Sequence, residues 1–321
     1  MSIMVAKSEM IIETHDSKLR ACNMNPKSWA SMPAIFTLSS QPVDEVMIYP
    51  RIYLACAQEI FATTLYITWA LTFFFFPSQI FDHPARPIIG SFNPCFGWDY
   101  PPASYIALVM CSFNVFLTWR YMWLSRARTV MENPDKVMSF CSCQRYTWYF
   151  SFKLWADLAL AFSSSLWLCL WLLGPKSNGT VQSVDLTPAT KEDIPQWTGH
   201  TLIFAFMALA WYCSVLAVWL EDVFDKDPNN NPTFTWTAYV IVYGLANLYL
   251  TLVYFTDLAM YTGEISELSG ATNYLPWYFT QFADIVWLIC LGSINSMMPY
   301  THAIKITKTL VYEDREALNQ A

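Results

Sequence analysis

Residues 278–294 read YFTQFADIVWLICLGSI, a long apolar run with one aspartate, Asp284, near its middle. A helix needs roughly 20 predominantly apolar residues to cross a lipid bilayer, and this run is close to that length. A carboxylate is costly in hydrocarbon, so ionisable residues within a span normally face the interior of a helix bundle. The stretch therefore predicts a membrane-spanning helix whose Asp284 faces other helices.

Five further apolar stretches of similar length precede this one. The six expected spans are 52–76, 103–125, 149–173, 201–224, 235–261 and 277–298. Of the 321 residues only 13% are charged and 55% are hydrophobic, whereas soluble domains are about a quarter charged. The runs do not alternate polar and apolar residues as the strands of a membrane barrel do. The sequence predicts an all-α polytopic membrane protein.

The expected domain organisation is one six-helix bundle with two tails. The transmembrane domain covers 51–300, between an N-terminal segment, 1–50, and a C-terminal tail, 301–321. Lysine and arginine are concentrated in the loop after the second span and in the C-terminal tail, and such residues favour the cytosolic side. Both termini are therefore expected in the cytosol, with the first span acting as an uncleaved signal anchor in a membrane of the secretory or endolysosomal system or the plasma membrane.

One glycosylation sequon agrees with this orientation. It is Asn178-Gly179-Thr180, in the loop expected on the lumenal or outer side. The sequence therefore predicts a glycan on Asn178. The net charge of −7 comes without a basic stripe, so nucleic acid is not an expected partner.

Ionisable side chains in the cytosolic half of the spans are expected to form one layer. At about 1.5 Å per helical residue, Glu59, Arg120 and Asp157 lie at similar depths. Lys153 lies four residues before Asp157, the spacing of neighbours on one helix face. We expect structural ion pairs here, between Glu59 and Arg120 and between Lys153 and Asp157.

A second polar layer is expected in the lumenal half. On the fifth span a polar stripe includes Asn247, and on the sixth Gln281 and Asp284 share a face, while a histidine begins the fourth span. The members of this layer are Asp284, Asp257, His200, Gln281, Tyr261 and Tyr254. Since no lysine or arginine is expected at the depth of Asp284, its carboxyl is either protonated or bound to tyrosines, His200 or water in a cavity.

No cofactor or metal is expected from the residues. The chain has only four histidines, divided between the two sides of the membrane, which excludes a clustered-histidine di-iron site and makes paired haem ligation a poor fit. No phosphate-binding glycine loop or H-E-x-x-H motif occurs. His200 and Asp284 would suit a general acid–base pair, but headgroup binding needs the same residues, so the sequence does not decide whether this is an enzyme.

Four short motifs resemble the FRAG/DRAM/Sfk family of six-pass membrane proteins, which includes GPI-anchor remodelling proteins. They are ARPIIGSFNPCFGW with the later WRYMW, ADLALAFSSS with Asp157, the histidine His200, and FADIVWL with Asp284. Asp157 and Asp284 stand where the family pattern has glutamate. The resemblance covers roughly 50–300 and implies a six-pass bundle with cytosolic termini that acts on or beside membrane lipids, as in fatty-acid exchange on GPI anchors.

Two other functions fit the same residues. Acids in both membrane halves are also what a proton or cation channel or transporter needs, although no inverted repeat is visible. A non-catalytic subunit of a larger membrane assembly would use the abundant tryptophan and phenylalanine for contacts with partner proteins. The sequence predicts membrane lipids as partners and leaves these alternatives open.

Overall fold

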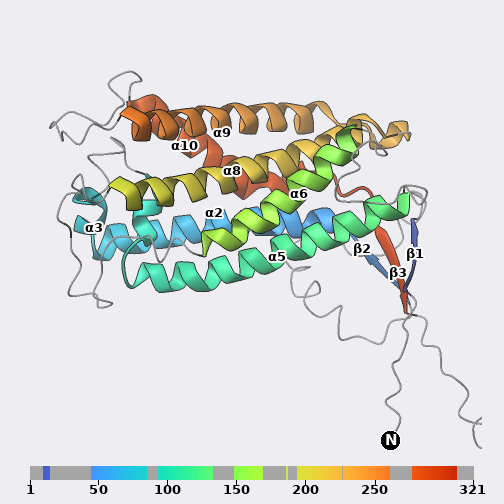
Figure 1. The fold of residues 1–321 in the computed structure, drawn as a ribbon, viewed down its shortest axis with the longest axis horizontal. Helices are drawn as coiled ribbons and strands as arrows, with labels where there is room; N and C mark the ends of the chain where they lie inside the picture. Colours follow the sequence, from blue (N-terminus) through green and yellow to red (C-terminus); the bar gives the residue numbers. More distant parts are fainter. Residues whose placement is uncertain are drawn as a thin grey trace, which may run out of the picture.

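The computed structural model describes residues 10–14, 45–84, 93–132, 148–168, 186, 194–225, 227–260 and 277–308. Six long helices dominate this part of the chain. They are α2 (Pro50–Phe75), α5 (Ala103–Glu132), α6 (Trp148–Trp167), α8 (Ile194–Val223), α9 (Phe234–Met260) and α10 (Trp277–Met297). Each helix packs on the next in chain order and α10 packs back on α2, so the six form a closed ring (Figure 1). The prediction of a helical bundle is confirmed.

Four of these helices are long and apolar enough to cross a membrane. The segments are Pro50–Phe75, Ala103–Thr129, Leu202–Val223 and Phe234–Val253. Their outer faces carry exposed large apolar side chains such as Leu245 and Leu252, which are 64% and 59% exposed. The class of integral membrane protein is therefore supported. Spanning by α6, which carries Lys153 and Asp157, and by α10, which carries Gln281 and Asp284, stays a prediction.

Three helices have bounds that differ from those of the expected spans, and one of them, α6, ends at Trp167, before the predicted end at 173. Helix α5 continues to Glu132, beyond the predicted end at 125, because the polar residues that follow are compatible with a helix outside the hydrocarbon. Helix α8 begins at Ile194, whereas its candidate span begins at Leu202, so His200 lies within the helix and close to the predicted start of the span. Pro195 lies in the first turn, where proline is well tolerated because its missing N–H would have no helical partner.

A small antiparallel sheet joins the two ends of the chain. Its strands are β1 (Met10–Thr14), β2 (Glu45–Ile48) and β3 (Ile304–Lys308), in the order β1-β3-β2. Ile304 pairs with Ile48 in β2 and with Thr14 in β1. The strands are short and rich in β-branched residues, which fit a pleated surface. This sheet is an addition to the all-α prediction, and it connects the two segments that were expected as separate tails.

The sheet marks one end of the bundle. At this sheet end, α2, α6 and α9 begin and α5, α8 and α10 finish (Figure 1). The opposite far end carries the short helix α3 (Ser78–Phe81) and the 3₁₀ helix η2 (Pro94–Trp98), both in the connection from α2 to α5. A second 3₁₀ turn, η5 (Pro228–Asn230), connects α8 to α9 at the sheet end.

An aromatic core fills the middle of the bundle. The Phe61 ring of α2 contacts Trp211 of α8 and Trp167 of α6, with centroid distances of 4.6 and 4.9 Å. It also contacts Trp98 of η2 at 5.4 Å and Trp287 of α10 at 5.9 Å. Aromatic pairs of this kind contribute about 0.5–1.5 kcal/mol each beyond burial. The core therefore holds helices from all sides of the ring together and separates the sheet end from the far end.

Candidate functional site

A cavity lies among α8, α9, α10 and η2 on the far side of the aromatic core. Its volume is ≈ 380 Å³ when the part open to the surroundings is included. The polar groups at its wall come from different segments: Asp284 of α10, Asn247 and Thr251 of α9, and Asn93 and Cys95 at η2. Apolar walls are supplied by Phe204, Leu250 and Trp287 among others. Concave apolar pockets with a few convergent polar groups are the usual form of small-ligand sites.

Helix α10 directs Asp284 into the bundle by its apolar periodicity. Trp287 and Leu288, three and four residues on, are buried with it, while Phe282 and Ile285 are exposed on the outer face. Asp284 itself is 4% exposed. This burial agrees with the predicted inward orientation of the carboxyl. The carboxyl also borders the cavity, where a ligand or water can lie beside it.

The two asparagines of the cavity are held by hydrogen bonds. Asn247 Nδ2 donates to the Ala208 carbonyl of α8 at 3.0 Å, which leaves its buried Oδ1 without a hydrogen-bond partner among the described residues. Asn93 Oδ1 accepts from the Cys95 backbone N–H at 2.8 Å and caps the start of η2. A buried amide oxygen without a partner is costly, so Asn247 is positioned to accept a hydrogen bond from a bound group.

Cys95 is the one thiol at the cavity wall. Burial raises the pKa of the Cys95 thiol well above its usual value, and the carboxyls of Asp99 and Asp284 act in the same direction. The nucleophilic form of cysteine is the thiolate, which this environment disfavours. The cavity therefore presents Cys95 as a small apolar contact and supplies Asp284 as its acidic group.

Most other members of the predicted lumenal layer lie partly or wholly outside the described residues. Gln281 is half-buried on α10 and does not line the cavity. The backbones of His200, Tyr254 and Asp257 lie within α8 and α9, but their side chains are outside the described residues, as is all of Tyr261. Asn178, with its predicted glycan, also lies outside the described residues. Asp284 and Asn247 are thus the two predicted inward groups that the structure brings together.

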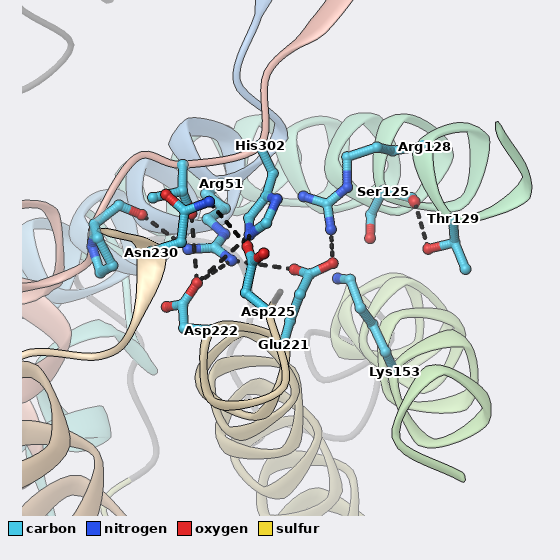
Figure 2. A network of polar contacts seen from close by, with 12 residues as sticks. Arg51, Ser125, Arg128, Thr129, Lys153, Glu221, Asp222, Asp225, Asn230 and His302 are labelled. Carbon is cyan, nitrogen blue, oxygen red and sulfur yellow. Dashed lines mark hydrogen bonds and ion pairs between the residues drawn. The ribbon is translucent and has the colours of Figure 1, made fainter. Parts of the chain in front are cut away.

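A buried network of charges occupies the sheet end. Arg51 Nη2 donates to Asp222 Oδ1 at 2.7 Å and to Glu221 Oε2 at 3.1 Å, and its Nη1 donates to the Pro299 carbonyl at 3.0 Å. Arg128 pairs with Glu221 from the other side (Figure 2). We call this set the charged network; its members are Arg51, Arg128, Glu221, Asp222, Asp225 and His302. It ties α2, α5 and α8 to the segment after α10.

His302 is the histidine of the network and lies outside the helices, in the segment after α10. Its Nε2 lies 3.1 Å from Asp225 Oδ2 and 3.7 Å from Asp222 Oδ1. Burial lowers the pKa of His302 to about 4, with Arg51 and Arg128 acting in the same direction against the two carboxylates. Its backbone is left-handed, with φ of 59°. A non-glycine residue adopts this conformation only where surrounding contacts hold it, so the network fixes a neutral imidazole in place.

Of the two predicted cytosolic ion pairs, the structure contains the one between Lys153 and Asp157 but not the one between Glu59 and Arg120. Lys153 Nζ lies 3.1 Å from Asp157 Oδ2, which also accepts from Ser125 Oγ at 2.6 Å. Glu59 and Arg120 do not meet. Arg120 is exposed, with its guanidinium 5.9 Å from the centre of the Tyr53 ring, whereas Glu59 faces α10. The two residues have matching depths but lie on faces of their helices that point in different directions.

Sequence reasoning missed the charged network because its members lie at the ends of the expected spans. Arg128 follows the predicted second span and belongs to the basic residues that indicate orientation, while Arg51 and the Glu221-Asp222 pair lie at span ends where the sequence shows no motif. The available signal was the presence of complementary charges at the same membrane face, since buried charges at that depth are paired as a rule. Among the described residues, the charged network included, no group of three or more histidine, cysteine, aspartate or glutamate side chains is placed to hold a metal ion.

No family model, curated protein or solved structure matches this chain.

Proposed function

We propose that this chain is a six-span membrane protein that binds the headgroup of a membrane lipid in the cavity around Asp284. The observation that carries the proposal is the pairing of a buried carboxyl with an apolar cavity between helices whose outer faces carry exposed apolar side chains. The Lys/Arg bias supports a cytosolic sheet end, and in that orientation the cavity would lie in the lumenal half. The resemblance to six-pass lipid-remodelling proteins supports the same class of ligand.

The chemistry of the wall selects among headgroups. Asp284 and the free Oδ1 of Asn247 are acceptors, so they suit a head that carries a cationic amine or several donors. Phe204 and Trp287 present aromatic rings at the same wall, and such rings attract cationic ammonium groups. A carboxylate repels an anionic head. We therefore expect an amine-bearing zwitterionic lipid to bind more tightly than an anionic one.

The cavity size limits what enters the bundle. The enclosed part of the cavity has room for about one water molecule, and most of the ≈ 380 Å³ belongs to its open side. A headgroup would therefore lie at this open side, beside Asp284, while acyl chains would lie along the outer faces of α8 and α9. Leu202, Phe206, Leu248 and Leu252 are exposed on those faces. We infer binding as the role of this wall, because its acceptors and aromatic rings suit a headgroup and its Cys95 thiol is disfavoured as a nucleophile.

A proton or cation path is the second candidate function. Glu59 lies on the sheet side of Phe61 in α2, and Asp284 lies on the far side of Trp287 in α10. Acids at both depths favour such a path. The aromatic core lies between them, so conduction would require Phe61 and its tryptophan neighbours to separate.

Native mass spectrometry of the full chain in mild detergent tests the lipid proposal. The protein is titrated with phosphatidylethanolamine and, separately, with phosphatidylglycerol. We expect one preferred phosphatidylethanolamine per chain and roughly tenfold weaker binding in Asp284→Asn, the loss expected for one charge-assisted contact. Ser296→Ala is the control, because Ser296 is exposed on the same helix and donates only to the Ser293 carbonyl. Equal binding by wild type and Asp284→Asn would overturn the proposal.

A further inference from the structure

Glu59 is a buried acid at the interface between α2 and α10. It is 4% exposed and lies near the sheet side of the aromatic core. The two helices are in contact here: a Cβ atom added to Gly292 would lie 3.8 Å from the Ala62 side chain and 4.0 Å from Tyr66, which are ordinary contact distances. The burial of Glu59 between the helices keeps bulk water away from its carboxyl.

The hydrogen bonding of Glu59 is incomplete. Its Oε1 accepts from the Asn295 backbone N–H of α10, at the long distance of 3.3 Å. Its Oε2 is buried and has no hydrogen-bond partner among the described residues. An ionised carboxylate has about four acceptor sites to satisfy. The side chain of Asn295 adds a second neutral contact, and Oε2 still lacks a hydrogen-bond partner among the described residues.

No positive charge compensates Glu59 in the described part of the chain. Arg51, on the same helix, is committed to Glu221, Asp222 and the Pro299 carbonyl. Arg120, the cation of the packed helix α5, points outward over Tyr53.

Among the described residues, the titratable groups that interact with Glu59 are a thiol and two phenols, none of which carries a positive charge. They are Cys56 on its own helix, Tyr239 of α9, and Tyr300 after α10. The Tyr239 hydroxyl donates to the Cys290 carbonyl at 2.8 Å, and the Tyr300 hydroxyl donates to Asn295 Oδ1, so neither hydroxyl is directed to the carboxyl. Burial raises the pKa of Tyr300, which keeps it a neutral phenol.

An uncompensated carboxylate at this position would be expensive, because burying an unpaired charge costs several kcal/mol. A neutral carboxylic acid avoids that cost. We propose that Glu59 is a proton-binding site in the α2–α10 interface, occupied by a proton at neutral pH. Loss of the proton would place an unpaired charge between two closely packed helices, so the bound proton stabilises their contact.

Asp157 provides a built-in comparison at a similar depth. It is 2% exposed, yet it has Lys153 and Ser125 as partners on one of its oxygens. A cation at 3.1 Å favours the ionised form. The two buried acids thus have opposite environments, and the proposal predicts opposite protonation states. The site lies across the aromatic core from the lipid cavity and does not depend on lipid binding there.

Infrared difference spectroscopy of the full chain in detergent tests this assignment. The carbonyl stretch of a protonated carboxyl is separate from the bands of a carboxylate. In the difference spectrum of wild type minus Glu59→Gln, we expect the carbonyl band of one protonated carboxyl, and this band should shift in D₂O. In the difference spectrum of wild type minus Asp157→Asn, we expect the bands of a carboxylate. A carboxylate signal lost in Glu59→Gln would overturn the proposal. If Glu59→Gln does not fold, Glu59→Asp replaces it in the test. This variant keeps a carboxyl, so the carbonyl band of the protonated acid should change in frequency and remain present.

A hydrophobic carbodiimide gives an independent chemical readout. The protonated acid transfers its proton to a carbodiimide nitrogen while its oxygen adds to the central carbon, and acyl migration to nitrogen then leaves a stable N-acylurea with no leaving group. We expect an adduct of one whole reagent on the peptide that contains Glu59, at least tenfold more than on the peptide with Asp157, and less as pH rises. Greater labelling of Asp157 than of Glu59 would contradict the proposal.

Discussion

The two ends of the bundle bury acidic groups in different ways. At the sheet end, Glu221 and Asp222 are nearly inaccessible, and two arginines meet them directly. At the far end, Asp284 is equally buried but lies at the wall of a cavity. The charges at the sheet end satisfy one another, whereas the carboxyl of Asp284 borders a cavity that a ligand can enter. The comparison assigns structural stability to the sheet end and binding to the far end.

The largest effect is expected from breaking the charged network. Arg51→Ala removes the cation that Glu221 and Asp222 share, and leaving buried carboxylates unpaired costs about 3–5 kcal/mol. Thermal or denaturant unfolding in detergent measures this loss. Arg126→Ala is the matched control, because Arg126 is an exposed arginine of α5 beside Trp123. Equal effects of the two substitutions would remove the stabilising role given to the sheet end.

Acidification is expected to weaken the same end through His302. The folded chain holds the pKa of His302 near 4, below its ordinary value of 6.5, so the unfolded chain binds the proton first as pH falls. This contribution is complete above about pH 6.5 and is lost as pH falls toward 4, with a maximum of about 3 kcal/mol. Melting temperature as a function of pH measures it.

The matched variant for this prediction is His302→Asn. Asparagine tolerates the left-handed backbone at this position but does not titrate. The variant should lose stability less steeply than wild type between pH 6.5 and 4. An unchanged slope would show that the carboxylates of the network, rather than His302, control the response to acid.

A smaller loss is expected at the far end from Gly97→Ala. A Cβ atom there would lie 2.5 Å from the Trp69 backbone Cα, so η2 must shift away from α2. Overpacking of this kind costs about 1–3 kcal/mol. Because η2 follows Asn93 at the cavity wall, phosphatidylethanolamine binding should weaken together with stability.

The control for this substitution is Gly292→Ala. A Cβ atom at Gly292 meets ordinary contact distances of 3.8–4.0 Å, and alanine is the better helix former. We expect unchanged or slightly raised stability and unchanged lipid binding. If Gly97→Ala were equally harmless, the close approach of η2 to α2 would not position the cavity.

The smallest effect on stability is expected from Asp284→Asn. The side chain keeps its size and loses only its charge beside the cavity, so unfolding should change by less than about 1 kcal/mol, although lipid binding falls. Thermal unfolding without added lipid measures the first quantity. A loss as large as that of Arg51→Ala would mean that Asp284, too, belongs to a structural network.

The sequence by itself determined the class of protein and much of what faces inward. Runs of about 20 apolar residues define helices whatever their neighbours, and helical spacing predicted the inward positions of Asn247 and Asp284 and the contact of Lys153 with Asp157. These features depend on distances along one helix, which the order of residues specifies directly.

Only the tertiary structure decided which buried charges meet. Depth in the membrane matched Glu59 with Arg120, but depth does not give the rotation of each helix about its axis, and the two side chains point apart. Arg51 and Asp222 are 171 residues apart in the chain and 2.7 Å apart in the structure. Such contacts depend on how the ring of helices closes, and no local pattern of residues specifies that closure.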